Sequence, residues 1–157
     1  MPPVNDMCGM AGNPEIVAQL DQAGDEQVVF SCSLAKKNRF GMKQERTLLL
    51  TNKKLYNVKK TEMQRAIALE NIKALTKSQD PKRATSFIVH VASEYDYQFD
   101  SEQRDDIFKQ IKYYYWNMKR TNLPIYAVKD SIDEFATKKT DIQKDREVQP
   151  MENSRQK

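Results

Sequence analysis

The feature that most constrains the fold of this 157-residue chain is a series of seven short apolar runs, followed by one longer stretch of different periodicity. In the last run, Tyr95, Tyr97 and Phe99 lie on one face of a strand, and Asp96 and Gln98 lie on the other. Such alternation over short runs with polar connectors is typical of an antiparallel meander. The segments predicted as strands are residues 27–34, 46–51, 54–58, 65–69, 72–76, 86–91 and 95–99.

A single amphipathic helix is predicted after the strands. Phe108, Ile111, Tyr115 and Met118 recur at spacings of three and four, which places them along one stripe of a helix of about five turns. Pro124 ends this pattern because proline cannot continue helical hydrogen bonding. A meander of seven strands bends into two near-orthogonal sheets with an open end, and an apolar helix closes that end around a single core.

The chain is expected to divide into three parts. Residues 1–25 form a leader with a short helix, for which Asn13 supplies the cap. Residues 26–121 hold the predicted strands and helix, and a core of this size suffices for independent folding. Residues 122–157 form a C-terminal extension, which is predicted to be a polar tail from about residue 138.

Composition argues against an enzyme, a metal site and a disulfide framework. The chain has two cysteines, Cys8 and Cys32, and a single histidine, His90, and it lacks Gly-rich phosphate loops and the HExxH and GxSxG patterns. Metal sites and general acid–base chemistry need more such groups. No apolar run approaches the length of a membrane span, and the N-terminus lacks a secretory signal pattern. We therefore predict a non-catalytic, cytoplasmic protein with no cofactor and no bound metal.

Residues 45–58 carry a resemblance to a known family. They read Glu-Arg-Thr-Leu-Leu-Leu-Thr-Asn-Lys-Lys-Leu-Tyr-Asn-Val, a strand that ends in a polar turn and a next strand that opens with Leu-Tyr. Together with residues 86–91 and 95–99, this segment resembles a pleckstrin homology domain, and most closely the lipid-binding tail domain of class I myosins. The resemblance covers about residues 26–121. It implies a mainly β fold, a seven-stranded orthogonal β-sandwich or barrel capped by one C-terminal α-helix.

Positive charge is concentrated between residues 36 and 60. This window holds nine lysines and arginines against one glutamate, whereas the whole chain carries a net charge of +4. In the predicted fold the first and third inter-strand loops lie at the open end of the barrel, so part of this charge converges there. A phosphorylated lipid headgroup requires convergent cations of this kind. The candidate headgroup-binding residues are Lys36, Lys37, Arg39, Lys43, Arg46, Lys53, Lys54 and Tyr56.

The resemblance implies the most specific roles for three of these residues. In lipid-binding pleckstrin homology domains, a lysine late in the first strand, an arginine in the second and often a tyrosine in the third contact the phosphates. The matching positions here are Lys37, Arg46 and Tyr56, although Gln44 replaces a basic residue of the family pattern. Three consecutive leucines follow Arg46, so the sequence does not show which face of this strand points inward. The place of Arg46 at the start of the predicted strand nevertheless puts it at the open end of the barrel. We expect Arg46 to lie there, near Lys37 and Tyr56.

These features predict a membrane-targeting or adaptor domain that binds phosphoinositides or other anionic lipids through its basic loop, at the inner face of a membrane. Phe40 and Met42, at the tip of that loop, are predicted to insert into the interface as apolar anchors. The alternative is a structural subunit of a cytoskeletal or ciliary assembly that uses the same fold for protein contacts. Both tails and an exposed patch at Tyr113 and Trp116 are then the expected contact surfaces. Nucleic acid is not an expected partner, because the basic window lacks surface aromatic residues other than Phe40.

Overall fold

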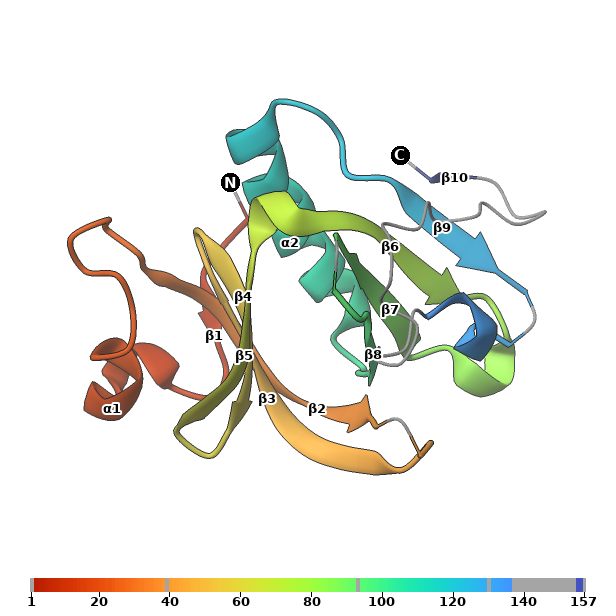
Figure 1. The fold of residues 1–157 in the computed structure, drawn as a ribbon, viewed down its shortest axis with the longest axis horizontal. Helices are drawn as coiled ribbons and strands as arrows, with labels where there is room; N and C mark the ends of the chain where they lie inside the picture. The colour runs from red at the N-terminus through yellow and green to blue at the C-terminus, as the bar shows by residue number, and fades with distance from the viewer. Residues whose placement is uncertain (1, 39, 93, 130, 137–154, 157) are drawn as a thin grey trace.

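The computed structural model describes residues 2–38, 40–92, 94–129, 131–136 and 155–156, and its centre is a two-layered arrangement of strands (Figure 1). All seven predicted strands are present, with ends shifted by a few residues. The first layer holds β2 (Val28–Lys37), β3 (Lys43–Thr51), β4 (Lys54–Lys59) and β5 (Glu62–Ala68). The second layer holds β6 (Ile72–Ser78), β7 (Ser86–Val91) and β8 (Tyr97–Asp100).

Strand pairing follows chain order within each layer, which confirms the meander. β2 pairs with β3, β3 with β4 and β4 with β5, and β6 pairs with β7 and β7 with β8, all antiparallel. The two layers are joined where β2 pairs with β8, with Ala35 opposite Asp100 and Lys36 opposite Phe99. Between β5 and β6 the chain turns through η2 (Leu69–Asn71). The two layers therefore form the predicted sandwich.

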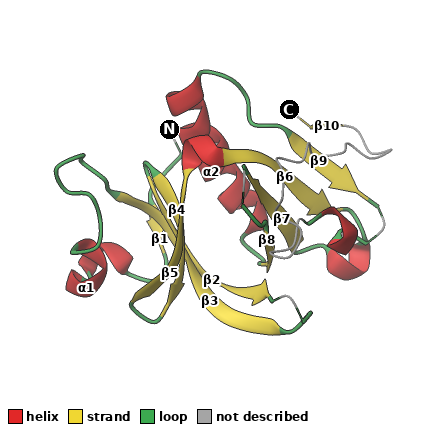
Figure 2. Cartoon of the chain, in the orientation of Figure 1, coloured by secondary structure: helices red, strands yellow, loops and turns green. Residues whose placement is uncertain are grey.

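The main core lies between the inner faces of the two layers and one helix, α2 (Arg104–Lys119) (Figure 2). Phe108 and Ile111 of α2 are buried, and the Phe108 ring contacts Phe87 of β7 edge to face, with ring centroids 5.4 Å apart. Because α2 also packs against η2, it covers the end of the first layer where β5 finishes. The prediction of a barrel capped by one C-terminal helix is therefore confirmed.

The N-terminal residues lie against the outer face of the first layer. β1 (Asn5–Asp6) pairs in parallel with β2, and η1 (Met10–Gly12) and α1 (Pro14–Val17) follow. Asn13 caps α1, since its side chain accepts a hydrogen bond from the Glu15 N–H.

A second apolar cluster joins this N-terminal segment to the sheet. Ile16 of α1 is fully buried against Leu49 and Tyr56, on the face of the first layer that turns away from the main core. Leu48 and Leu50, on either side of Leu49, belong to the main core. The strand therefore needs apolar residues on both faces, which explains its run of three leucines.

The C-terminal residues extend the second layer. β9 (Ile125–Val128) pairs in parallel with β6, and β10 (Arg155–Gln156) pairs antiparallel with β9. A short turn, η4 (Asp133–Phe135), follows β9, and Ile132 packs against Ile88 of β7. Most of the tail predicted from about residue 138 falls outside the described residues. Within the described residues, no helix has the length and apolar character needed to cross a membrane.

Candidate functional site

The end of the first layer away from η2 is bordered by three connections. The β2–β3 hairpin, where Lys37 is paired with Lys43, and the β4–β5 turn, where Lys59 is paired with Glu62, are both at this end. The β7–β8 loop reaches the same end, where the Nη2 atom of Arg65 donates a hydrogen bond to the Tyr95 carbonyl oxygen at 2.6 Å. We call this end the barrel mouth.

Three cationic side chains line the inner face of the mouth. Arg46 lies opposite Leu34, whose side chain is part of the main core, so Arg46 shares the inner face of the sheet. Lys36 lies two residues after Leu34, so its side chain is on the same face of the strand. Arg65 precedes core residue Ile67 by the same interval. The inward placement of Arg46 agrees with the expectation, but its reason was wrong, because β3 begins three residues earlier, at Lys43.

Among the described residues, little negative charge is paired with these three cations. Burial, and then the charges of Arg46 and Arg65, lower the pKa of Lys36, which shows that the three groups act on one another. Arg46 donates to the Glu45 carbonyl at 2.7 Å and to the Gln44 amide oxygen at 3.4 Å. Among the described residues, the only ion pair of the three is that of Arg65 with Glu94, at 3.3 Å. An anion placed at the mouth relieves this mutual repulsion.

The expected placement of Lys37 beside Arg46 is wrong by one position. Successive strand residues point to opposite faces, so Lys36 takes the inner place and Lys37 the outer one. The Lys37 ammonium lies 3.1 Å from the carboxylate of Asp133, in the C-terminal extension. Asp133 also accepts hydrogen bonds from Arg83 and Gln98. The hydrogen bond from Arg83 is the largest influence on the pKa of Asp133, which lies far below its ordinary value.

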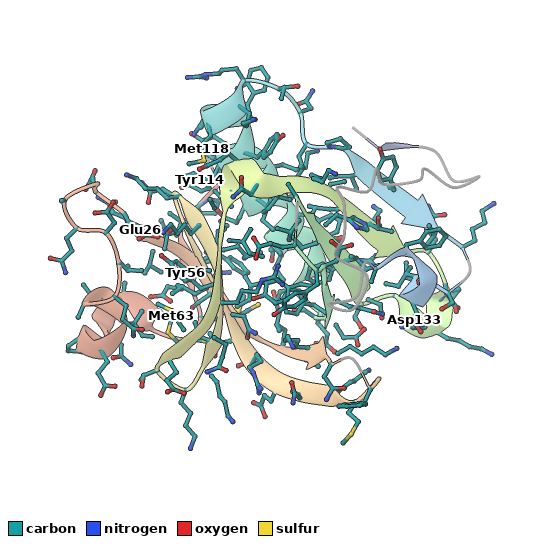
Figure 3. The ribbon with its side chains drawn as sticks, in the orientation of Figure 1. Glu26, Tyr56, Met63, Tyr114, Met118 and Asp133 are labelled. Atoms are coloured by element: carbon teal, nitrogen blue, oxygen red, sulfur yellow. The ribbon has the colours of Figure 1, made fainter. Side chains whose placement is uncertain are left out.

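The expected placement of Tyr56 near Arg46 is also wrong. Tyr56 lies on the outer face of β4, and its hydroxyl donates to the Glu26 carboxylate at 2.6 Å. Figure 3 shows both residues on the α1 side of the first layer and Asp133 on the opposite side of the molecule. The reason is again that successive residues of a strand point to opposite faces. Leu55 points into the main core, so the next residue, Tyr56, points away from it.

The remaining predicted cations lie at two ends of the sheet. Lys53 and Lys54 are at the β3–β4 turn, the opposite end of β3 from the mouth, so the structure does not bring them to the other candidates. Lys43 is at the mouth, largely exposed, with its ammonium 3.1 Å from the Asp100 carboxylate. Arg39 falls outside the described residues.

The β2–β3 hairpin presents two apolar side chains at its tip. Phe40 is 73% exposed and Met42 is 65% exposed. The Asn38 side-chain oxygen accepts hydrogen bonds from the N–H groups of both residues, at 2.9 and 3.0 Å. Gly41 between them has φ of 80°, a left-handed conformation that suits glycine. The turn is therefore held by its own polar groups while Phe40 and Met42 face solvent beside the mouth.

Sequence reasoning missed three residues of the mouth: Asn57, Arg65 and Tyr97. Asn57 is paired with Arg65 across β4 and β5. The Arg65 guanidinium lies over the rings of Tyr95, at 3.8 Å, and Tyr97, at 4.3 Å. The sequence did contain a signal for Arg65, because it lies two residues before the apolar Ile67 in a predicted strand and therefore shares its face.

The arrangement defines the class of the protein. A two-layered sandwich of seven meandering strands, closed by one helix and cationic at its open end, is a pleckstrin-homology-like domain. Residues 4–157 match the model of a family described as unconventional myosin tail, actin- and lipid-binding. The chain belongs to this family of myosin tail domains.

Solved structures are similar to this chain at low sequence identity, and two with a TM-score above 0.5 show the same fold. The hSac2 domain of the human phosphoinositide phosphatase Sac2 is similar with a TM-score of 0.51 and 18% identity, over 74% of this chain and 90% of that one. The C-terminal domain of an unknown protein from Leishmania infantum has a TM-score of 0.51 and 16% identity, over 60% and 88%. A pleckstrin homology domain solved in solution has a TM-score of 0.49 and 21% identity, over 59% and 88%. A comparison with curated protein sequences found no match.

Proposed function

We propose that this domain is a non-catalytic module that binds anionic membrane lipids through the barrel mouth. The observation that carries the proposal is the convergence of Lys36, Arg46 and Arg65 on the inner face of the mouth with a single carboxylate paired to them among the described residues. The family description, actin- and lipid-binding, supports the same assignment.

The β2–β3 hairpin supplies the apolar part of the proposed contact. Phe40 and Met42 extend from the rim of the cationic mouth, so an anionic headgroup at the mouth brings the hairpin tip to the lipid interface. Each engaged cation contributes about 1 kcal/mol near an anionic leaflet. A few cations and two apolar side chains give reversible, salt-sensitive attachment rather than permanent anchoring. The proposed location is therefore peripheral, at the cytoplasmic face of a membrane.

Vesicle sedimentation tests this proposal. Wild-type protein is expected to bind vesicles of phosphatidylcholine mixed with phosphatidylserine, and binding is expected to fall between low and physiological salt. The double variant Lys36→Ala, Arg46→Ala should lose most of this binding. The matched control is Lys53→Ala, Lys54→Ala, which removes the same charge at the opposite end of the sheet and should retain binding.

Two results would contradict the proposal. Equal binding to pure phosphatidylcholine vesicles would show that charge is not the cause. Equal loss in the two double variants would show that overall charge, and not the mouth, attracts the membrane.

A second candidate function is a protein contact on the exposed face of α2. Lys112, Trp116 and Lys119 share one stripe of the helix, and Trp116 is 42% exposed. Among the described residues these lysines form no ion pair. Figure 1 shows α2 ending at the top of the view and the β2–β3 hairpin at the bottom, so the two surfaces face different directions. A partner bound to α2 leaves the mouth accessible to a membrane.

Filamentous actin is the first partner to test, because the family description names it. Co-sedimentation with filaments should be weakened by Trp116→Ala and by Lys112→Glu, whereas vesicle binding should stay unchanged. Binding of both variants equal to that of the wild type would exclude this face of α2 as the contact.

A further inference from the structure

Ser131 is an exposed serine between β9 and η4, and the residues that follow it are acidic. Asp133 and Glu134 stand two and three positions after Ser131, and no lysine or arginine occurs among residues 132–137. Of the serines that the structure describes, only Ser33 and Ser131 are exposed. Ser33 is followed by Leu-Ala-Lys-Lys. A protein kinase that selects acidic substrates by charge therefore has one suitable acceptor among these exposed serines.

The Ser131 hydroxyl lies beside the contact that ties the C-terminal extension to the sandwich. Its oxygen accepts a hydrogen bond from the Asp133 N–H at 3.3 Å. The Asp133 carboxylate binds both Nη atoms of Arg83, at 2.9 and 3.3 Å, and the Lys37 ammonium at 3.1 Å. A phosphoryl group on Ser131 extends the side chain by only two bonds, so its oxygens stand next to this carboxylate and its cations.

A phosphoryl group here reverses the sign of the local charge. Arg83 and Lys37 face the carboxylate of Asp133, and Lys43, on the other arm of the hairpin, faces that of Asp100. Three cations thus meet two carboxylates in these ion pairs. A phosphoserine carries almost two negative charges at pH 7, so negative charge exceeds positive once it forms. The affected surface adjoins the β2–β3 hairpin, the part of the protein proposed to approach the membrane.

The segment around Ser131 is held by contacts that can open locally. Ile132 is its buried apolar anchor and packs against Ile88 and Val128 in a small cluster separate from the main core. Asp133 is its polar anchor. A segment held by so few buried side chains opens at a lower free energy than the strands of the main core do. In the open form residues 131–134 are extended, which is the form that a kinase binds.

We propose that Ser131 is a phosphorylation site for an acid-directed serine kinase, and that its phosphorylation releases the domain from anionic membranes. The γ-phosphoryl group of ATP moves to the Ser131 hydroxyl oxygen: the P–O bond to ADP breaks, a P–O bond to serine forms, and the hydroxyl proton passes to a base of the kinase. The phosphoryl oxygens then compete with Asp133 for Arg83 and Lys37. Their charge opposes the approach of the mouth to an anionic leaflet. This inference rests on the proposed function and adds its regulation.

Phosphate incorporation tests the site without any membrane. The purified chain is treated with an acid-directed kinase, casein kinase II, and ATP, and mass spectrometry locates the phosphate. Wild type is expected to be modified at Ser131, and the matched control Ser33→Ala, which removes the other exposed serine, should be modified equally. Glu134→Gln should slow the modification several-fold, because it removes an acidic determinant. Arg83→Gln should speed it, because it loosens the Asp133 contact and leaves the acceptor sequence intact. A peptide containing Ser131 that stays free of phosphate would overturn the site.

Vesicle sedimentation tests the effect of the modification. Phosphorylated wild type is expected to bind vesicles of phosphatidylcholine and phosphatidylserine about ten- to thirtyfold more weakly than the unmodified chain, since two negative charges oppose an anionic leaflet. Kinase-treated Ser131→Ala should bind like untreated wild type. Unchanged binding by chain that carries phosphate at Ser131 would overturn the regulatory role and leave lipid binding standing. Failure of both forms to bind vesicles would overturn the proposed function, whereas phosphate found at Ser131 would still uphold the modification site.

Discussion

Glu26 is a buried acidic residue that is hydrogen-bonded to Tyr56 of the second apolar cluster. Its carboxylate accepts hydrogen bonds from the Thr51 and Tyr56 hydroxyls, both at 2.6 Å, and from the Asp21 N–H at 2.8 Å. Burial raises the pKa of Glu26, but these hydrogen bonds and the charge of Lys54 outweigh it, so the pKa lies below its ordinary value of 4.5. A carboxyl whose pKa is depressed by folding stabilises the protein above the unfolded-state pKa, and this stabilisation is lost as the pH falls below it.

Tyr56→Phe tests this network and the role of Tyr56 together. The variant loses one hydrogen bond to a charged acceptor, so the free energy of unfolding at pH 7 should fall by about 1.5–3 kcal/mol. The difference from wild type should narrow as the pH drops below 4.5, because protonation of Glu26 removes the charge that strengthens the bond. Urea unfolding at several pH values measures both effects. Vesicle binding should not change, and its loss would return Tyr56 to the headgroup site.

At the scale of elements, α2 decides whether the two layers share one core. It lies against both the sheets and η2, and Phe108 fills the space beside Phe87. The apolar stripe of α2 is buried along most of its length, whereas Trp116 and Met118 near its end are exposed. The predicted stripe is therefore correct for Phe108, Ile111 and Tyr115, and it ends one turn before Met118.

Phe108→Ala should destabilise the domain by about 3–5 kcal/mol, because it leaves a cavity between α2 and the second layer. This is a large part of the stability of a single domain, so the melting temperature should fall by well over 10 °C or the variant should not fold. Lys109→Ala, at an exposed position of the same helix, is the control and should melt close to the wild type. A near-native melting temperature for Phe108→Ala would mean that α2 is not the closing element.

At the scale of the whole molecule, Asp133 ties the C-terminal extension to three separate parts of the fold. It accepts from Lys37 of β2, from Arg83 of η3 (Pro81–Arg83) and from Gln98 of β8. The hydrogen bond from Arg83 is the main reason why the pKa of Asp133 is lowered, so this contact is present at neutral pH and is lost only in strong acid. The contact also keeps Lys37, a cation at the edge of the mouth, paired with a carboxylate.

Asp133→Asn should release Lys37 and strengthen binding to anionic vesicles. One additional cation near an anionic leaflet contributes about 1 kcal/mol, or roughly a fivefold gain in affinity. The thermal stability of the variant should fall at the same time. Glu70→Gln, at an exposed position of η2 away from the mouth, removes the same charge and should leave vesicle affinity nearly unchanged. An equal gain in both variants would mean that net charge, and not the release of Lys37, is responsible.

The local patterns of the sequence were enough to predict the strands and the helix. Period-two alternation and period-three-and-four spacing arise within short segments, so no distant part of the chain is needed to recognise them. The clustering of lysines and arginines between residues 36 and 60 is likewise a property of the chain itself. The alternation and spacing predicted the pleckstrin-homology-like fold. The clustering of charge did not predict which cations meet, since Lys53 and Lys54 lie at the opposite end of β3 from Arg46.

Only the tertiary structure decided which neighbour on each strand faces inward. Lys36 rather than Lys37, and Asn57 rather than Tyr56, line the mouth, because the register of β2 and β4 follows the packing of Leu34 and Leu55 in the main core. The three leucines of β3 did not indicate which face is the inner one, because the N-terminal segment packs on the outer face and makes it apolar as well. A shift of one residue reverses every side chain of a strand, and only contacts between distant segments determine which alternative holds.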